Sequence, residues 1–110
     1  MKLTAEEELW LQSYRDILSK QFPGVVDQII VFGSKAKGTA TEDSDLDLLL
    51  VIQDGDWKVK DAITQPGYLL ALDRNAVPSM IVLTKKEWES LRIREAPFWQ
   101  TVQREGVALQ

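Results

Sequence analysis

Apolar residues in the first part of the chain recur at the spacing of a helix. Thr4 followed by Glu7 is the pattern of a capping box, which opens a helix. Pro23 and Gly24 interrupt helices, so this one is expected to end near Phe22. The apolar residues that recur at helical spacing are Leu9, Trp10, Tyr14, Ile17 and Leu18. The pattern therefore predicts an amphipathic first helix.

Two continuous apolar runs follow, separated by a short polar connection. Residues 25–32 and 46–52 are rich in β-branched and other apolar side chains, which is typical of buried strands. Between them, residues 33–38 predict a turn that can continue as one helical turn, and residues 39–44 predict a polar loop. The sequence thus predicts two core strands joined by a glycine-containing connection.

After the second strand the pattern returns to a helical period. Residues 53–56, with the sequence Gln-Asp-Gly-Asp, are a turn signal. Residues 57–72 read as helical in part, and the Pro66-Gly67 pair is expected to interrupt the helix. The apolar piece that follows, residues 68–72, is expected to pack inward.

The last third of the chain predicts one more strand and two helices. Residues 77–83 form the third strand, and Thr84 with Glu87 repeats the capping-box pattern. A last helix is bounded by the proline and glycine of residues 97–106. Residues 107–109 are either a short edge strand or a frayed tail. Elements in this order predict an α/β fold with a small mixed sheet covered by helices.

Composition narrows the chemistry. The 110 residues suffice for one domain, residues 1–110, and 45% of them are hydrophobic, which supports a packed core. The net charge of −4 disfavours bulk nucleic acid as a partner but leaves a small phosphate ligand open. The chain has no cysteine and no histidine, which excludes disulfides, thiolate or imidazole metal sites and a Ser-His-Asp triad. Any metal is therefore held by oxygen, which points to magnesium, manganese or calcium.

The N-terminal residues bear on where the protein acts. They are acidic and lack the apolar stretch of a signal peptide. No apolar segment reaches the roughly 18 residues expected of a membrane span. We therefore expect a cytoplasmic protein with no membrane partner.

Two carboxylates stand at the start of the second strand. Side chains alternate between the faces of a strand, so Asp45 and Asp47 are expected on one face while Leu46 and Leu48 point into the core. Two carboxylates on one face repel each other, and burying both is costly unless a cation accompanies them. A hard divalent metal accepts such oxygen ligands, and a bound triphosphate would supply more of them. These residues predict a metal site at Asp45 and Asp47.

The turn before the carboxylates has the features of a phosphate site. Gly33 follows a strand, and glycine lets a phosphate approach the backbone closely. The amides after it and the Ser34 hydroxyl are able to bond phosphate oxygens. Lys35 and Lys37 either add positive charge to this site or are ordinary solvated side chains, and the sequence leaves both readings open.

Each of these features also has a purely structural reading. An isolated Asp-x-Asp caps a strand and an isolated Gly-Ser marks a turn, so the prediction depends on their combination between two strands. The tryptophans are interpreted as core or interface anchors rather than as residues that stack on a base. They are Trp10, Trp57, Trp88 and Trp99.

The combined stretch resembles a known protein family. Residues 31–38, Val-Phe-Gly-Ser-Lys-Ala-Lys-Gly, and residues 44–48, Ser-Asp-Leu-Asp-Leu, resemble the signature of the DNA polymerase β-like nucleotidyltransferase superfamily. More narrowly, they look like the minimal nucleotidyltransferases of bacteria and archaea. Residues 82–88 and 102–107 are also similar to that group, so the resemblance covers most of the chain. It implies the nucleotidyltransferase fold, a small mixed sheet flanked by helices.

The resemblance also implies an activity and a partner. A nucleoside triphosphate would donate NMP, with AMP from ATP as the first expectation, to a hydroxyl acceptor in a magnesium- or manganese-dependent reaction. Asp45 and Asp47 would be the catalytic metal ligands, and Gly33 and Ser34 would contact the nucleotide. The implied partner is a helical protein of the HEPN type in a toxin–antitoxin pair, and the acceptor is expected on that partner. The number of chains that assemble is left open.

One position departs from the family pattern. Active members carry a third carboxylate on a later strand, and the equivalent position here is Ser79, because residues 77–82 contain no Asp or Glu. Without that carboxylate a metal site loses a ligand and a possible base is missing. Two alternatives therefore stand beside the transferase. One is a weakened or inactive binding module of the same fold, acting as an antitoxin-like partner, and the other is a regulatory domain that binds metal without nucleotide.

Overall fold

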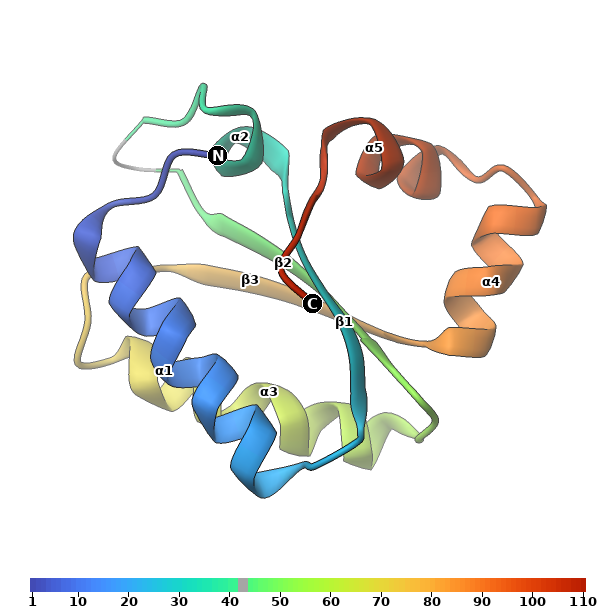
Figure 1. Ribbon diagram of the computed structural model, residues 1–110, viewed down its shortest axis with the longest axis horizontal. Coiled ribbons are helices and arrows are strands. Elements are labelled where there is room, and N and C mark those ends of the chain that lie inside the picture. The colour runs from blue at the N-terminus through green and yellow to red at the C-terminus, as the bar shows by residue number, and fades with distance from the viewer. Residues whose placement is uncertain (42–43) are drawn as a thin grey trace.

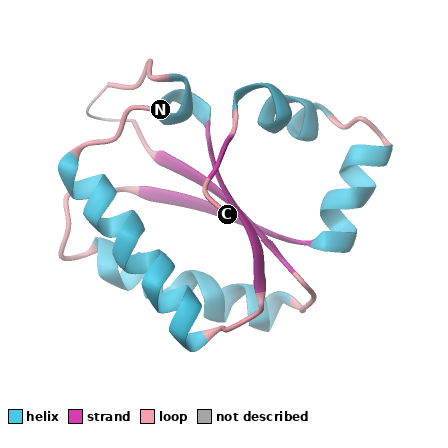
Figure 2. Ribbon diagram, in the orientation of Figure 1, coloured by secondary structure: helices cyan, strands magenta, loops and turns pink. Residues whose placement is uncertain are grey.

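The protein is built around a mixed sheet with helices on both faces. The computed structural model describes residues 1–41 and 44–110, and within them it contains one four-stranded sheet in the order β3-β2-β1-β4 (Figures 1 and 2). Strand β1 pairs antiparallel with β2 and β4, whereas β2 pairs parallel with β3. The elements are α1 (Ala5–Gln21), β1 (Val26–Phe32), α2 (Gly33–Lys37), β2 (Leu46–Ile52), α3 (Trp57–Ala71), β3 (Pro78–Thr84), α4 (Lys85–Ile93), α5 (Pro97–Glu105) and β4 (Val107–Ala108). The α/β fold predicted from the sequence is confirmed. Of the two alternatives for residues 107–109, the structure shows the short edge strand, β4, and not a frayed tail.

Alternate residues of β2 face two different hydrophobic cores. Leu46, Leu48 and Leu50 are fully buried in the core that α1 and α3 cover. Leu49 and Val51 belong to the second core, beneath α4 and α5. Because both faces of the sheet are covered, β2 has a continuous apolar sequence rather than an alternating one. Figure 1 shows α1 and α3 together on one side of the sheet and α4 and α5 on the other.

Helix α1 begins as predicted but buries a slightly different face. Thr4 and Glu7 form the capping box through reciprocal hydrogen bonds of 2.9 and 3.1 Å. Leu9, expected on the buried face, is 44% exposed, whereas Leu11 is buried. The buried positions are Glu7, Trp10, Leu11, Tyr14 and Leu18. The buried face of α1 therefore begins with a charged residue, Glu7, and does not include Leu9.

Helix α3 runs without a break through Pro66 and Gly67, so the predicted interruption is wrong. Two aromatic side chains of α1 bond to backbone carbonyls of this region: Trp10 Nε1 donates to Gly67 at 2.9 Å and the Tyr14 hydroxyl donates to Ile63 at 2.6 Å. A Cβ at Gly67 would lie 3.0 Å from the Tyr14 ring, so glycine provides the space for this packing. Tertiary contacts therefore outweigh the low helix propensity of the Pro-Gly pair.

The apolar piece at the end of α3 points outward in large part, which contradicts the prediction for residues 68–72. Leu69 is 61% exposed and Leu72 is 80% exposed, because the core-facing positions of this turn are taken by Leu70 and Ala71. Tyr68 is also exposed, and its hydroxyl accepts a hydrogen bond of 3.3 Å from the Met80 amide of the edge strand β3.

Helix α3 has 15 residues, and across the described ranges no helix combines the length and apolar character needed to cross a membrane.

An aromatic cluster fixes α4 and α5 to the second face of the sheet. Phe98 makes edge-to-face contacts with Phe32, at 5.5 Å between ring centroids, and with Trp88, at 6.1 Å. Trp88 and Trp10 are buried and Trp99 packs on this core, as predicted for anchoring residues. Trp57 is 70% exposed at the start of α3, so it is not a core residue.

Candidate functional site

The two candidate carboxylates lie where β2 begins. Asp47 is the second residue of β2, and strand alternation places it on the face of Leu49 and Val51, beneath α4 and α5. Asp45 precedes the strand and is exposed, whereas Asp47 is half-buried. The residue between them, Leu46, is fully buried in the opposite core, as expected from the alternation.

Among residues 1–41 and 44–110, no salt bridge compensates the charge of the Asp47 carboxylate. Burial, and secondarily the negative charge of Asp45, raises the pKa of Asp47 above its ordinary value. Both effects disfavour the ionised form of Asp47. A bound cation would favour the ionised form and so lower this pKa. The donor set therefore fits a hard divalent metal that prefers oxygen ligands, such as magnesium or manganese.

The turn at Gly33 makes direct contact with this carboxylate. Gly33 has a φ of +75°, in the left-handed region that favours glycine. A Cβ at this position would overlap Asp47 Oδ2 and would lie 3.3 Å from Asp47 Cγ. Phe32, directly before the turn, is the register partner of Asp47 across the two central strands. The glycine is therefore needed both for its backbone conformation and for the space that the carboxylate occupies.

Helix α2 follows the glycine as a single short turn, as the sequence predicted. Phe32 at its N-cap provides no side-chain acceptor for the first amides, which are those of Gly33, Ser34 and the residues after them. At the other end, the amides of Gly38 and Thr39 donate to α2 carbonyls. The arrangement places backbone donors without a side-chain cap beside the Asp47 carboxylate, which suits a ligand that carries both an anion and a metal ion.

Of the two lysines of α2, Lys37 is exposed, as the solvated reading predicted, whereas Lys35 is not. Lys35 is buried, and its Nζ lies 3.0 Å from Glu7 Oε1. Lys37 is more exposed and lies 3.6 Å from Glu105 of α5. Sequence reasoning missed the Glu7–Lys35 pair. A signal was present, because Glu7 lies four residues before Leu11 on the buried face of α1.

Ser79 occupies the position where the family resemblance implies a third carboxylate. It is the register partner of Asp47 in the parallel pair of β2 and β3, so the two side chains lie on the same face of neighbouring strands. Within residues 1–41 and 44–110, no three acidic side chains converge as a metal-binding group. In the described part of the site, the position beside the Asp45 and Asp47 carboxylates therefore carries the Ser79 hydroxyl in place of a third carboxylate.

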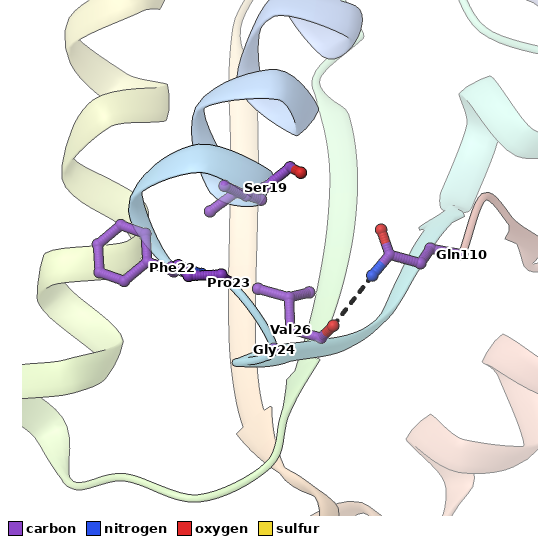
Figure 3. A pocket seen from close by; sticks show the side chains of 7 residues that line it. Ser19, Phe22, Pro23, Gly24, Val26 and Gln110 are labelled. Carbon is purple, nitrogen blue, oxygen red and sulfur yellow. Dashed lines mark hydrogen bonds between the residues drawn. The ribbon is translucent and has the colours of Figure 1, made fainter.

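A separate hollow of about 280 Å³ lies far from these residues (Figure 3). Its lining includes Phe22, Gly24 and Val26, at the beginning of β1, and Gln110, whose side chain donates to the Val26 carbonyl at 2.9 Å. The Gly33 turn follows the opposite end of the same seven-residue strand. The hollow therefore contributes nothing to the carboxylate site.

Comparisons with known proteins agree on one family and one fold. The family model for the nucleotidyltransferase domain matches residues 11–98. A protein of Methanocaldococcus jannaschii, named a putative protein adenylyltransferase, is 40% identical over 45 residues, which cover 41% of this chain and 45% of that protein. The chain thus matches less than half the length of this curated relative.

Solved structures with similar folds point the same way. A toxin–antitoxin structure with AMP-PNP has a TM-score of 0.59 at 22% identity, over 97% of this chain and 73% of the other. A mutant of the toxin–antitoxin MntA–HpeT gives 0.57 at 21% identity, over 91% and 71%. A structure from Sulfolobus solfataricus, described as a putative nucleotidyltransferase, gives 0.56 at 17% identity, over 97% and 87%. At these identities the similarity establishes the fold.

Proposed function

Because this chain belongs to the nucleotidyltransferase domain family, we propose that it transfers a nucleoside monophosphate, AMP from ATP, to a hydroxyl group. The observation that carries the proposal is the contact between the Gly33 turn and the Asp47 carboxylate. It brings a phosphate-binding backbone and a metal-binding side chain to one point, and a metal–triphosphate complex needs both.

Each site residue has a distinct part in this proposal. Asp45 and Asp47 hold magnesium or manganese, and the backbone at Gly33 with the Ser34 hydroxyl holds the triphosphate. The metal supplies Lewis-acid neutralisation of the charge on the phosphate oxygens. The raised pKa of Asp47 supports this assignment, because the bound cation offsets both the burial and the Asp45 charge that cause the shift.

The reaction is an in-line displacement at the α-phosphorus. The acceptor hydroxyl oxygen forms a bond to this phosphorus, and the bond between the phosphorus and the oxygen bridging to the β-phosphate breaks. Pyrophosphate leaves, and the hydroxyl proton is taken up by solvent or by a group on the acceptor protein. We assign the proton to these acceptors because, among residues 1–41 and 44–110, the position beside Asp47 carries Ser79 and not a carboxylate.

We propose that the acceptor lies on a helical partner protein of the HEPN type, as one half of a toxin–antitoxin pair. Two similar structures are described as toxin–antitoxin structures, and the curated relative is named a putative protein adenylyltransferase. The exposed apolar side chains Trp57 and Leu69 of α3 and Leu72 directly after it provide surface for such a partner.

The test incubates the purified chain and its partner with ATP and magnesium and measures the intact mass of the partner. The expected result is a mass increase of one adenylyl group, AMP less one water, which the Asp45→Asn plus Asp47→Asn variant abolishes. Asp61→Asn plus Asp73→Asn is the matched control, because it makes the same change in charge at two exposed positions. An unmodified partner, together with no binding of ATP and magnesium by calorimetry, would reject the transferase.

The second candidate is a binding module that keeps the fold without the chemistry. Ser79 favours it, because the position beside Asp47 carries no carboxylate. In that case the Asp45→Asn plus Asp47→Asn variant still forms the complex and still neutralises the toxin in cells. Loss of neutralisation, with the fold and the complex intact, would instead support the enzyme.

A further inference from the structure

A buried ion pair joins the first helix to the candidate phosphate-binding turn. Lys35 of α2 and Glu7 of α1 lie 3.0 Å apart, and each side chain is only 4% exposed. The same Glu7 oxygen, Oε1, accepts the Thr4 amide at 2.9 Å within the capping box. The Lys2 amide donates to the Lys35 carbonyl at 2.9 Å, and Figure 1 places the N-terminus beside α2. Two separate contacts therefore tie residues 2–7 to α2.

The energetics of this pair indicate a role in geometry rather than in stability. A buried ion pair contributes little compared with apolar residues of similar volume, because both charges lose their hydration. Removing one partner, or moving it out of reach, is strongly unfavourable because it leaves a buried charge alone. Any displacement of α2 that separates Lys35 from Glu7 is penalised in this way. A five-residue helix has little stability of its own, so external contacts decide its position.

We infer that Glu7 and Lys35 are positioning residues that set the place of the Gly33–Ser34 backbone relative to Asp47. This inference rests on the proposed function for its effect on nucleotide binding. Gly33 touches the Asp47 carboxylate, and Lys35 is attached to Glu7 only two residues later. The short turn is therefore fixed between a carboxylate of the site and a carboxylate of α1. Neither Glu7 nor Lys35 needs to touch the substrate for this effect.

The chain contains a close match to this arrangement outside the site. Glu87 forms the capping box of α4, and its Oε1 accepts both the Thr84 amide at 2.8 Å and Lys60 Nζ at 2.7 Å. This second pair is more exposed, with side-chain exposures of 26% for Lys60 and 47% for Glu87. Thr84 is paired with Ile52, at the end of the sheet opposite Asp47. The Lys60–Glu87 pair therefore provides a control for the loss of a lysine and a capping glutamate away from the site.

The experiment compares Glu7→Gln plus Lys35→Met with Glu87→Gln plus Lys60→Met. Both variants keep a capping side chain, because glutamine also serves in a capping box, and neither leaves an unpaired charge. We expect the first to weaken the binding of magnesium–ATP about tenfold by calorimetry, as for the loss of a group that orients a ligand-binding residue. The control variant is expected to remain within about twofold of the original chain. Lys35→Arg keeps the charge beside Glu7, so this variant is expected to retain most of the original chain's affinity for magnesium–ATP.

A second readout follows the turn itself by hydrogen exchange. The Lys2 amide bonds to Lys35 and the Thr39 amide to Ser34, so faster exchange at both reports a loosened α2. Unchanged exchange and equal ATP affinities in the two variants would overturn the inference. If the original chain does not bind magnesium–ATP, the proposed function fails, and hydrogen exchange alone decides the positioning role. If the double variant does not fold, Glu7→Asp takes its place in both measurements, because it keeps both charges and shortens the side chain that holds Lys35.

Discussion

Replacing Gly33 by alanine is expected to introduce two separate costs at one position. The backbone there has a φ of +75°, which an L-residue adopts at a cost of about 1–2 kcal/mol. The new methyl group would also overlap Asp47 Oδ2. Relieving such an overlap by shifting the backbone or side chain costs about 1–3 kcal/mol. Together they predict that Gly33→Ala lowers the free energy of unfolding by about 2–5 kcal/mol.

Gly24 separates these two costs. It has the same φ of +75°, but a Cβ added there meets no atom within 4 Å. Gly24→Ala is therefore expected to cost only the conformational part, about 1–2 kcal/mol. Both substitutions also stiffen the unfolded chain by a similar amount, so this effect cancels in the comparison. The difference between the two variants measures the contact between Gly33 and Asp47.

A double-mutant cycle tests whether Asp47 is the group that meets the new methyl. Asp47→Ala removes the carboxylate and leaves its Cβ, which lies 3.6 Å from the position of the added atom, an ordinary contact distance. Gly33→Ala is then expected to cost about as much as Gly24→Ala. The assay is urea unfolding followed by the fluorescence of the buried Trp10 and Trp88. Equal costs for Gly33→Ala and Gly24→Ala in the original background would refute the close contact.

Three further predictions concern single side chains. Burial and Asp45 raise the pKa of Asp47, so ionisation of this carboxylate destabilises the folded state at neutral pH. Asp47→Asn should therefore stabilise the metal-free protein at neutral pH, and the gain should disappear as the pH falls below the ordinary pKa of 3.8. Urea unfolding in the presence of a chelator measures this difference. Tyr14→Phe leaves the Ile63 carbonyl without its donor and should cost about 1–3 kcal/mol of unfolding free energy; a thermal midpoint like that of the original chain would contradict this bond. Ser79→Asp places a carboxylate beside Asp47 and should tighten manganese binding in calorimetric titration, whereas unchanged affinity would show that this position does not reach the metal.

The elements that sequence reasoning predicted correctly are those with local signals. Both capping boxes, at Thr4 and at Thr84, require only residues three apart, and both form as predicted. The proline and glycine around residues 97–105 likewise bound α5. The apolar run of β2 predicted burial because a strand covered on both faces has no polar side. In each case the information lies within a few residues of the element.

The errors arise where distant residues determine the local structure. The Pro-Gly pair of α3 was expected to break the helix, yet Trp10 and Tyr14 of α1 bond to carbonyls of this region. Lys35 was expected to be solvated or to face an anion, yet Glu7, 28 positions earlier, pairs with it. The helical pattern gives a signal that Glu7 is buried, but nothing near it in the sequence identifies Lys35 as its partner.

Only the part of the candidate site with a local signal could be predicted from the sequence. Strand alternation was enough to predict that Asp47 lies on the opposite face from Leu46 and Leu48. The family resemblance, and not the strand pattern, pointed to Ser79, which the structure aligns with Asp47. The contact between Gly33 and the Asp47 carboxylate was not predictable, because it depends on the register of β1 against β2. That contact is also what links the two halves of the proposed site.

The distribution of charge around α2 gives a physical reason to expect a ligand at the carboxylates. The short helix lies between two acidic groups, Glu7 on one side and Asp47 on the other. Lys35 compensates Glu7, whereas no salt bridge among residues 1–41 and 44–110 involves Asp45 or Asp47. Because the Lys35 side chain is held at Glu7, it does not neutralise the site. In the function proposed above, a metal–triphosphate complex would supply positive charge to Asp45 and Asp47 together with an anion for the neighbouring amides.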